Sequence, residues 1–218
     1  MSILSINNIV YTFGSYELSY IELIGTAFGL LAVYWASREN IWTWPASLIN
    51  VAALFVLFYQ INLYADMFLQ IYFFVVSLYG WYNWQHSDIA EKPLPITTMN
   101  NNQILRYAVA LVIGTVAIGY LMSQIHLYFP TTFTEPAGFP YADAFTTTAS
   151  ILAMILLSQK KMENWLLWIS VDVVAVILYY MKGVLFLSVE YIIFLIICIF
   201  GYINWQKEYD KNSVIAIE

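Results

Sequence analysis

The sequence has few charged residues and a single cysteine. Only 10% of its 218 residues are Asp, Glu, Lys or Arg, whereas a soluble domain has about a quarter. A water-soluble globular fold is therefore excluded. One cysteine, Cys198, rules out a disulfide within the chain. The formal net charge of −6 offers no basic surface, so we predict no nucleic-acid partner.

The chain also lacks the common motifs of enzymes and of metal or phosphate sites. It has two histidines, and it contains no HExxH, no CxxC and no phosphate-binding glycine loop. No soluble domain that could bind ATP stands out either. We therefore predict that the protein is not an enzyme and that it uses no metal and no cofactor.

Apolar and aromatic residues dominate what remains. The chain is 61% hydrophobic and 18% aromatic, with a mean hydropathy of +0.70. Apolar runs of about 20 residues recur, which is the length of a membrane-spanning helix, whereas barrel strands would alternate over about 10 residues. We predict an all-α integral membrane protein with seven transmembrane helices. The predicted spans are Ser19–Ser37, Ile41–Gln60, Tyr64–Trp84, Ile104–Ile125, Ala142–Ser158, Trp165–Met181 and Val184–Trp205.

The basic residues predict the orientation. If seven spans alternate sides, Lys182 falls on one face, and the other face holds Arg38, Lys92, Arg106, Lys160, Lys161, Lys207 and Lys211. The positive-inside rule then places the N-terminus outside and the C-terminus in the cytoplasm. Residues 1–18 are predicted to be an external segment, either a short interfacial amphipathic helix or disordered, and residues 206–218 a cytoplasmic tail.

The first three spans repeat in the last three. At an offset of 121 residues Trp44 overlays Trp165, and the clearest block aligns Gly80, Asn83, Trp84 and Gln85 with Gly201, Asn204, Trp205 and Gln206. A copy that followed three spans directly would be inverted in the membrane, because three spans end on the opposite side from where they begin. One additional helix between the copies gives both the same orientation. We therefore predict a 3+1+3 architecture of parallel three-helix repeats, with the substrate site between the bundles. The bundles are residues 19–84 and 142–205, and residues 85–141 form loops and a linker helix (span 104–125).

Asp172 lies in the apolar run from Trp165 to Met181. Because a charge inside a bilayer is costly, such an acid is by default a functional hypothesis. Trp165, Trp168 and Asp172 are spaced i, i+3 and i+7, which predicts one helical stripe. Indole faces and a carboxylate suit an aromatic, cationic solute. Two alternatives stay open: Trp165 as an interfacial belt residue, and Asp172 as a buried acid satisfied by another helix.

The stripe belongs to one half of the repeat only. At the same offset Asp172 meets Val51 and Trp168 meets Ser47. An asymmetric ligand requires this kind of asymmetry. Four more residues complete the predicted substrate-binding set, because they lie near these positions or could face the space between the bundles: Asn50, Gln70, Glu190 and Tyr191.

The segment Glu163-Asn-Trp-Leu-Leu-Trp-Ile-Ser-Val-Asp172 resembles the signature of the Pnu family of bacterial vitamin transporters, which is Trp, two residues, Trp, three residues, then Asn or Asp. The resemblance implies a fold related to SWEET sugar transporters, a homotrimer in the bacterial inner membrane, and facilitated diffusion of a vitamin that is trapped by phosphorylation. It also implies a binding role for Trp165, Trp168 and Asp172.

The resemblance leaves the vitamin open. PnuC-like members, which take nicotinamide riboside, commonly carry Asn where this chain has Asp172; PnuT-like members take thiamine, and RibM-like members take riboflavin. An acceptor-only carboxylate suits the amino donor of thiamine. We therefore predict facilitative uptake of thiamine. Nicotinamide riboside, also a small cationic aromatic vitamin, is the alternative, and a membrane receptor or scaffold that does not transport is a weaker one.

Overall fold

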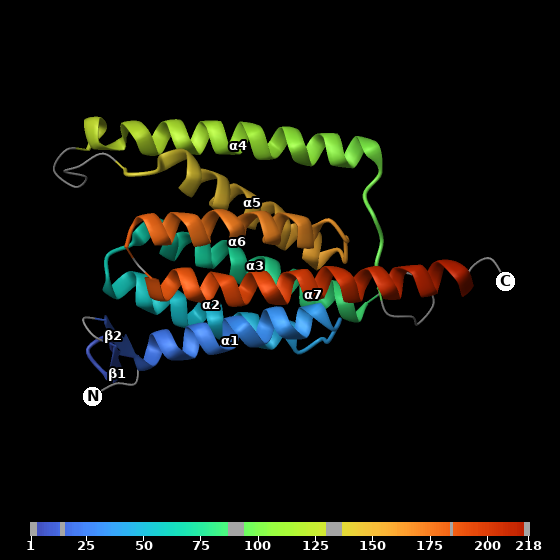
Figure 1. The fold of residues 1–218 in the computed structure, drawn as a ribbon, viewed down its shortest axis with the longest axis horizontal. Helices are drawn as coiled ribbons and strands as arrows, with labels where there is room; N and C mark the ends of the chain where they lie inside the picture. The colour runs from blue at the N-terminus through green and yellow to red at the C-terminus, as the bar shows by residue number, and fades with distance from the viewer. Residues whose placement is uncertain (1–3, 14–15, 87–93, 130–136, 184, 216–218) are drawn as a thin grey trace. The chain divides into compact units, whose positions relative to one another are not determined.

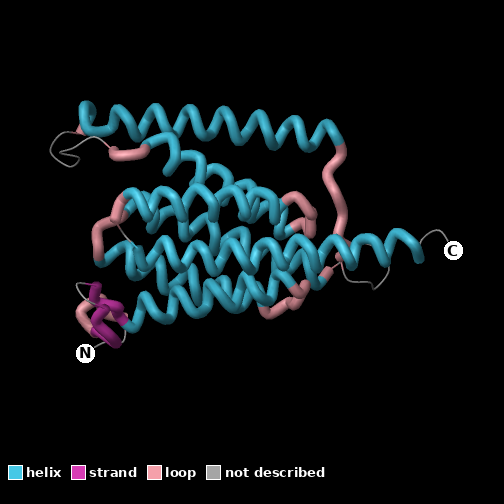
Figure 2. Tube along the Cα trace, in the orientation of Figure 1, coloured by secondary structure: helices cyan, strands magenta, loops and turns pink. Residues whose placement is uncertain are grey.

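The computed structural model describes residues 4–13, 16–86, 94–129, 137–183 and 185–215. Figure 1 shows the described elements in chain order, and Figure 2 colours them by type. They are β1 (Ile9–Phe13), β2 (Tyr16–Ser19), α1 (Tyr20–Ser37), α2 (Thr43–Gln60), α3 (Tyr64–Gln85), α4 (Asn101–Tyr128), α5 (Pro140–Ser158), α6 (Asn164–Met181) and α7 (Leu185–Ile215). The chain divides into two compact units, Met1–Leu94 and Pro95–Glu218.

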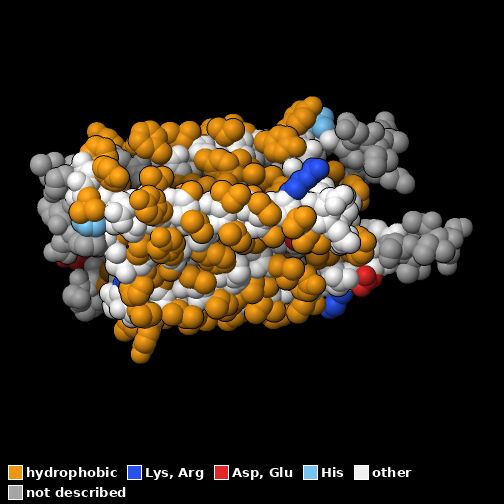
Figure 3. All heavy atoms as spheres, turned by 90° about the horizontal axis from the view of Figure 1, so that it is seen from above, with side chains coloured by type: hydrophobic (Ala, Val, Ile, Leu, Met, Phe, Trp, Pro, Cys, Tyr) orange, Lys and Arg blue, Asp and Glu red, His pale blue; other side chains and the backbone are white. Residues whose placement is uncertain are grey.

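Every predicted span coincides with a helix. Six of the helices in the described residues are long and apolar enough to cross a membrane, namely α1, α2, α4, α5, α6 and α7. α3 is not among them, and it carries the polar residues Asp66 and Gln70 in its first half and Asn83 and Gln85 in its last turn. α4 and α7 run past the predicted spans, to Tyr128 and Ile215, and Val184 lies outside the described residues. Figure 3 shows one face covered mainly by hydrophobic side chains, as expected next to lipid.

The N-terminal segment contradicts the predicted amphipathic helix or disorder. β1 and β2 pair as an antiparallel hairpin, formed by β-branched and aromatic residues that favour strands. Gln60, at the end of α2, forms hydrogen bonds with the segment just before the hairpin. Its Oε1 accepts from the Ile6 amide at 3.1 Å, and its Nε2 donates to the Leu4 carbonyl at 2.6 Å. The described fold is therefore helical with one small sheet.

Local capping fixes where several helices begin. Ser19 caps α1 by accepting a hydrogen bond from the Glu22 amide at 3.3 Å. Asn100 and Gln103 form a reciprocal capping box at the start of α4, with distances of 2.9 and 3.0 Å. Pro45 lies in the first turn of α2, where its missing N–H costs no helical hydrogen bond.

The two units repeat each other's turns at the offset of 121 residues. Glu39 and Lys160, which follow the first helix of each repeat, have φ values of 53° and 48°. Asn62 and Gly183, which follow the second, have φ values of 59° and 75°. Left-handed backbone is uncommon outside glycine, so matching positions are informative. The repeat seen in the sequence is thus a repeat of local structure.

A packing motif of two tryptophans and a glycine also occurs in both units. Trp44 meets Trp84 edge to face at 5.2 Å, and Trp165 meets Trp205 in the same way at 5.5 Å. All four rings are buried. A Cβ on Gly80 or Gly201 would lie 2.2 or 2.6 Å from the ring of Trp44 or Trp165. The Gly and Trp of the repeated block therefore hold helices at close approach.

In the second unit, α4 packs directly on α5. The two helices approach closely at Gly114, where a Cβ would lie 2.6 Å from the Thr148 side chain. The segment preceding α4, residues 96–99, is bound to the α5–α6 turn, and we call it the strap. Thr97 pairs with Lys161 as an isolated bridge, and the Glu163 carboxylate accepts from the Met99 amide at 2.7 Å. α4 is therefore anchored to the second unit through both its helix face and its N-terminal strap.

We expect the Glu163→Ala variant to be less stable than the wild type, because it leaves the partly buried Met99 amide of the strap without its acceptor. A hydrogen bond of this kind contributes about 1 kcal/mol. The melting temperature is measured in detergent by heating samples and monitoring the loss of the folded peak in size-exclusion chromatography. Glu163→Gln keeps an acceptor oxygen and should melt close to the wild type. Equal melting temperatures for Glu163→Ala and the wild type would contradict a stabilising role for the strap.

Candidate substrate site

α6 and α7 meet in three side-chain pairs spaced seven residues apart along each helix. Trp165 contacts Trp205, Asp172 contacts Cys198, and Tyr179 stacks on Tyr191 with ring centroids 5.4 Å apart. Seven residues are almost two helical turns, or about 10.5 Å, so each pair lies two turns from the next along an antiparallel helix pair. We call these three pairs the α6–α7 ladder.

The first unit shows which parts of this ladder are specific to the second. At an offset of 121 residues, the corresponding positions hold Trp44 and Trp84, Val51 and Ser77, and Phe58 and Gln70. The Trp–Trp pair is the same in both units, so it is explained by packing. The other two pairs differ in chemistry. Asp172, Cys198 and Tyr191 therefore mark where the second unit departs from its repeat.

Asp172 is 3% exposed, and the Cys198 thiol from α7 hydrogen-bonds its carboxyl group. The carboxyl oxygen Oδ2 is buried and has no hydrogen-bond partner among the described residues. A buried polar atom in this state costs about 1–3 kcal/mol, so native proteins normally satisfy it with water or a ligand. The alternative in which another helix satisfies Asp172 accounts for only part of the carboxyl group.

The structure separates the two tryptophans of the predicted stripe. Trp165 is 1% exposed and its ring lies against Gly201 and Trp205. Trp168 is only half-buried. It lies roughly 60° around the helix from Trp165, and one turn before Asp172. Trp168 is therefore partly exposed, whereas the Trp165 ring is enclosed by its own unit.

Tyr191 and Glu190 lie at the far end of the ladder. Tyr191 is half-buried, stacks on Tyr179, and comes within 6.0 Å of the Phe194 ring. Asp172 and Glu190 both act electrostatically on Tyr191. Aromatic and acidic groups thus follow one another along α6 and α7, and they include every predicted residue of the second unit except the enclosed Trp165.

The predicted residues of the first unit have local partners. The Asn50 Nδ2 donates to the Gly25 carbonyl of α1 at 2.7 Å. Gln70 is 6% exposed, and its Nε2 reaches the Asp66 carbonyl at 3.4 Å. Ser77, at the position that corresponds to Cys198, shares a hydrogen bond with Ser47 at 2.9 Å. Asn50 therefore links α2 to α1, and its carbonyl oxygen is the part left for other roles.

Sequence reasoning missed Cys198. The residue belongs to no motif, and a lone cysteine in an apolar helix is usually a small core residue. The signal that finds it is the pairing of the two helices. Once Trp165 meets Trp205, the residue seven positions later on α6 must meet the residue seven positions earlier on α7.

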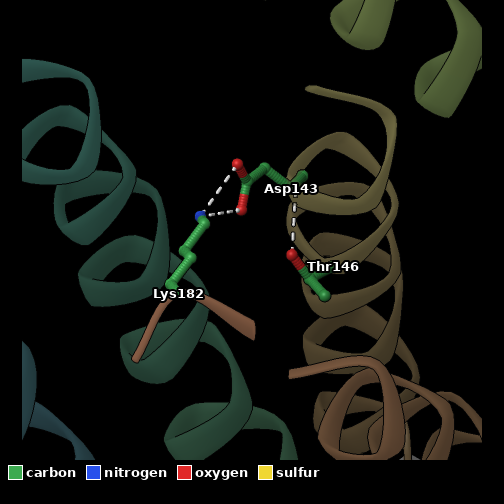
Figure 4. A network of polar contacts seen from close by, with 3 residues as sticks. All are labelled: Asp143, Thr146 and Lys182. Carbon is green, nitrogen blue, oxygen red and sulfur yellow. Dashed lines mark hydrogen bonds and ion pairs between the residues drawn. The ribbon is translucent and has the colours of Figure 1, made fainter. Parts of the chain in front are cut away.

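One further polar contact belongs to the frame of the second unit. Lys182, at the end of α6, pairs with Asp143 at the start of α5, with Nζ–Oδ distances of 3.1 and 3.2 Å (Figure 4). The Lys182 and Asp143 side chains are 34% and 43% exposed, and an ion pair this accessible contributes little stability. Across the described residues, no group of three or more His, Cys, Asp or Glu could hold a metal.

Residues 19–207 match the family described as nicotinamide mononucleotide transporter. The chain belongs to this family. Nicotinamide riboside transporter PnuC of Escherichia coli (strain K12) is 34% identical over 94% of this chain and 92% of that protein. Riboflavin/roseoflavin transporter RibM of Streptomyces davaonensis is 25% identical over 98% of this chain and 97% of that protein. The Pnu resemblance is thereby confirmed.

A solved structure agrees with the fold. The crystal structure of the vitamin B3 transporter PnuC aligns with a TM-score of 0.66, at 24% identity, over 88% of this chain and 83% of that one. The alignment shows that the two chains share their helical fold. Together with the apolar helices, family membership identifies a vitamin transporter of the bacterial inner membrane.

Proposed function

We propose that this protein carries nicotinamide riboside across the bacterial inner membrane by facilitated diffusion, with trapping by phosphorylation in the cytoplasm. One observation carries the proposal: 34% identity to a nicotinamide riboside transporter over 94% of the chain. The predicted thiamine substrate gains no support from the relatives named above. The hydrogen-bond argument behind it was too weak, because a carboxylate accepts from the amide and hydroxyl donors of nicotinamide riboside as well as from the amino group of thiamine.

The neighbourhood of Asp172 suits the chemistry of this vitamin. Nicotinamide riboside has a cationic pyridinium ring, a carboxamide and ribose hydroxyls. In this proposal the partly exposed Trp168 stacks on the ring, and Asp172 Oδ2 accepts a hydrogen bond from the amide or a hydroxyl while balancing the charge. Tyr191 and Glu190 complete the binding surface on α7. Trp165 supports α6 from behind through its contact with Gly201.

The wider architecture in this proposal is a 3+1+3 arrangement of parallel repeats, assembled as a homotrimer with the N-terminus outside. The matching turn geometry of the two units supports the parallel repeats, as does α4, the one helix that the described residues show between them; the homotrimer rests on the family resemblance alone. The distribution of basic residues, with Lys182 alone on its side, supports the orientation. Asn50 and Gln70 remain predictions for the contribution of the first unit.

Riboflavin is the second candidate, because a riboflavin transporter matches 98% of this chain at 25% identity. Its ring is neutral, so it gives Asp172 no charge to balance. We therefore rank it below nicotinamide riboside, with thiamine as the third ligand to compare.

Titration calorimetry of the purified protein with nicotinamide riboside, riboflavin and thiamine tests the proposal. We expect nicotinamide riboside to bind at least about tenfold more tightly than the others, a difference of about 1.4 kcal/mol. Tighter binding of either other vitamin would overturn the substrate assignment. Counterflow of labelled vitamin in proteoliposomes separates a transporter from a receptor or scaffold, which would bind without exchange. A pH gradient should not concentrate the vitamin if diffusion is facilitated.

A further inference from the structure

Cys198 lies where nothing in the binding motif predicts a functional residue. It is 3% exposed in the middle of α7, and it occupies the central pair of the α6–α7 ladder opposite Asp172. The residue is the only cysteine in the chain. Its thiol contacts the one buried acid of α6, and that acid keeps an unpartnered oxygen.

We propose that Cys198 is a positioning residue that holds the Asp172 carboxyl group so that Oδ2 is presented to the substrate. This inference rests on the proposed function, because it concerns the same site. It goes beyond that function by assigning substrate recognition to a residue outside the Trp-Trp-Asp motif.

The geometry of a carboxylate explains why such a partner matters. The terminal torsion of an Asp side chain has a broad, roughly two-fold energy profile, so an unrestrained carboxyl group samples many orientations. A donor on one oxygen limits that rotation and leaves the second oxygen for another donor. A thiol is a weak donor, and it therefore orients the carboxyl group without competing strongly with a ligand.

The first unit supplies the contrast. At the positions of Asp172 and Cys198 it has Val51 and Ser77, and there Ser77 pairs with Ser47 instead. Val51 and Ser77 are buried at 4% and 0% exposure. Neither of these corresponding positions in the first unit carries an acid. The Asp172–Cys198 pair replaces a purely local contact with one that keeps an acceptor open.

The first test needs no ligand. Because the chain has one cysteine, its S–H stretching band in the infrared spectrum belongs to Cys198 alone. We expect this band to move to higher wavenumber in Asp172→Ala, since the thiol loses its acceptor. Asp143→Ala, which removes an acid elsewhere in the same unit, should leave the band in place. An unchanged band in Asp172→Ala would overturn the proposal.

The second test is a double-mutant cycle with the vitamin that the wild type binds most tightly among nicotinamide riboside, thiamine and riboflavin. We expect Cys198→Ala to weaken binding about fivefold, the effect of one modest hydrogen bond, and Cys198→Ser to restore most of it. In the Asp172→Ala background, Cys198→Ala should have no further effect. Ser77→Ala serves as the matched control in the first unit.

The outcomes separate the two proposals. If Cys198→Ala and Asp172→Ala weaken binding independently, the positioning role is wrong even where nicotinamide riboside is the substrate. If another vitamin binds best but the two substitutions are coupled, the substrate assignment is wrong and the positioning role stands. A fall in melting temperature with unchanged affinity in Cys198→Ala would show a packing role and would also overturn the inference.

Discussion

Asp172→Ala is expected to weaken nicotinamide riboside binding about 10- to 100-fold, the range for a charge-assisted hydrogen bond of roughly 1.5–3 kcal/mol. The reason is that Asp172 Oδ2 is buried and unpartnered among the described residues, so the substrate supplies its partner and the variant removes the acceptor. The fold should tolerate the change, because Ala removes a buried acid. Calorimetry and proteoliposome uptake give the affinity and the rate.

Two matched variants make this result specific. Asp172→Asn keeps an acceptor oxygen, so we expect it to retain most of the affinity for nicotinamide riboside. Asp143→Asn neutralises an acid that pairs with Lys182 at the end of the same unit, and it should bind as the wild type does. Wild-type affinity in Asp172→Ala would remove Asp172 from the site, and equal losses in both Asp172 variants would point to charge alone.

Gly201→Ala and Gly80→Ala are expected to produce the largest losses of stability. Each new Cβ would lie 2.6 or 2.2 Å from a buried indole ring. Overpacking of this kind costs about 1–3 kcal/mol, because a Trp between two helices has no room to move. The melting temperature of each variant in detergent should fall by several degrees.

Gly138→Ala is the matched control for both variants. No heavy atom lies within 4 Å of its would-be Cβ, so its melting temperature should equal that of the wild type. Because the two Trp–Gly–Trp motifs have the same geometry, we expect similar losses from the two units. A stable Gly201→Ala would show that the helices can separate without cost, and the packing explanation of the repeated block would then be wrong.

The sequence alone determined the class of protein and the positions of its helices. Apolar length and the 121-residue repeat can be read along the chain, and they predicted the helices; the spacing of Trp165, Trp168 and Asp172 gave the resemblance to the Pnu family. The prediction from local sequence pattern was wrong for the N-terminal segment, where a second kind of secondary structure was also compatible with the residues. The aromatic and β-branched residues of β1 and β2 formed a hairpin in place of a helix. Sequence pattern also did not identify the vitamin, because one acidic residue does not distinguish two cationic ligands.

Only the tertiary structure decided which side chains meet. Helical spacing placed Trp165, Trp168 and Asp172 on one stripe, but the register of α6 against α7 enclosed Trp165 beside Gly201 and Trp205 and left Trp168 half-buried. The same register placed Cys198 against Asp172. Periodicity along one helix fixes a face and not the partner of that face. The partner depends on how closely two helices pack, which the repeated Gly and Trp contacts determine.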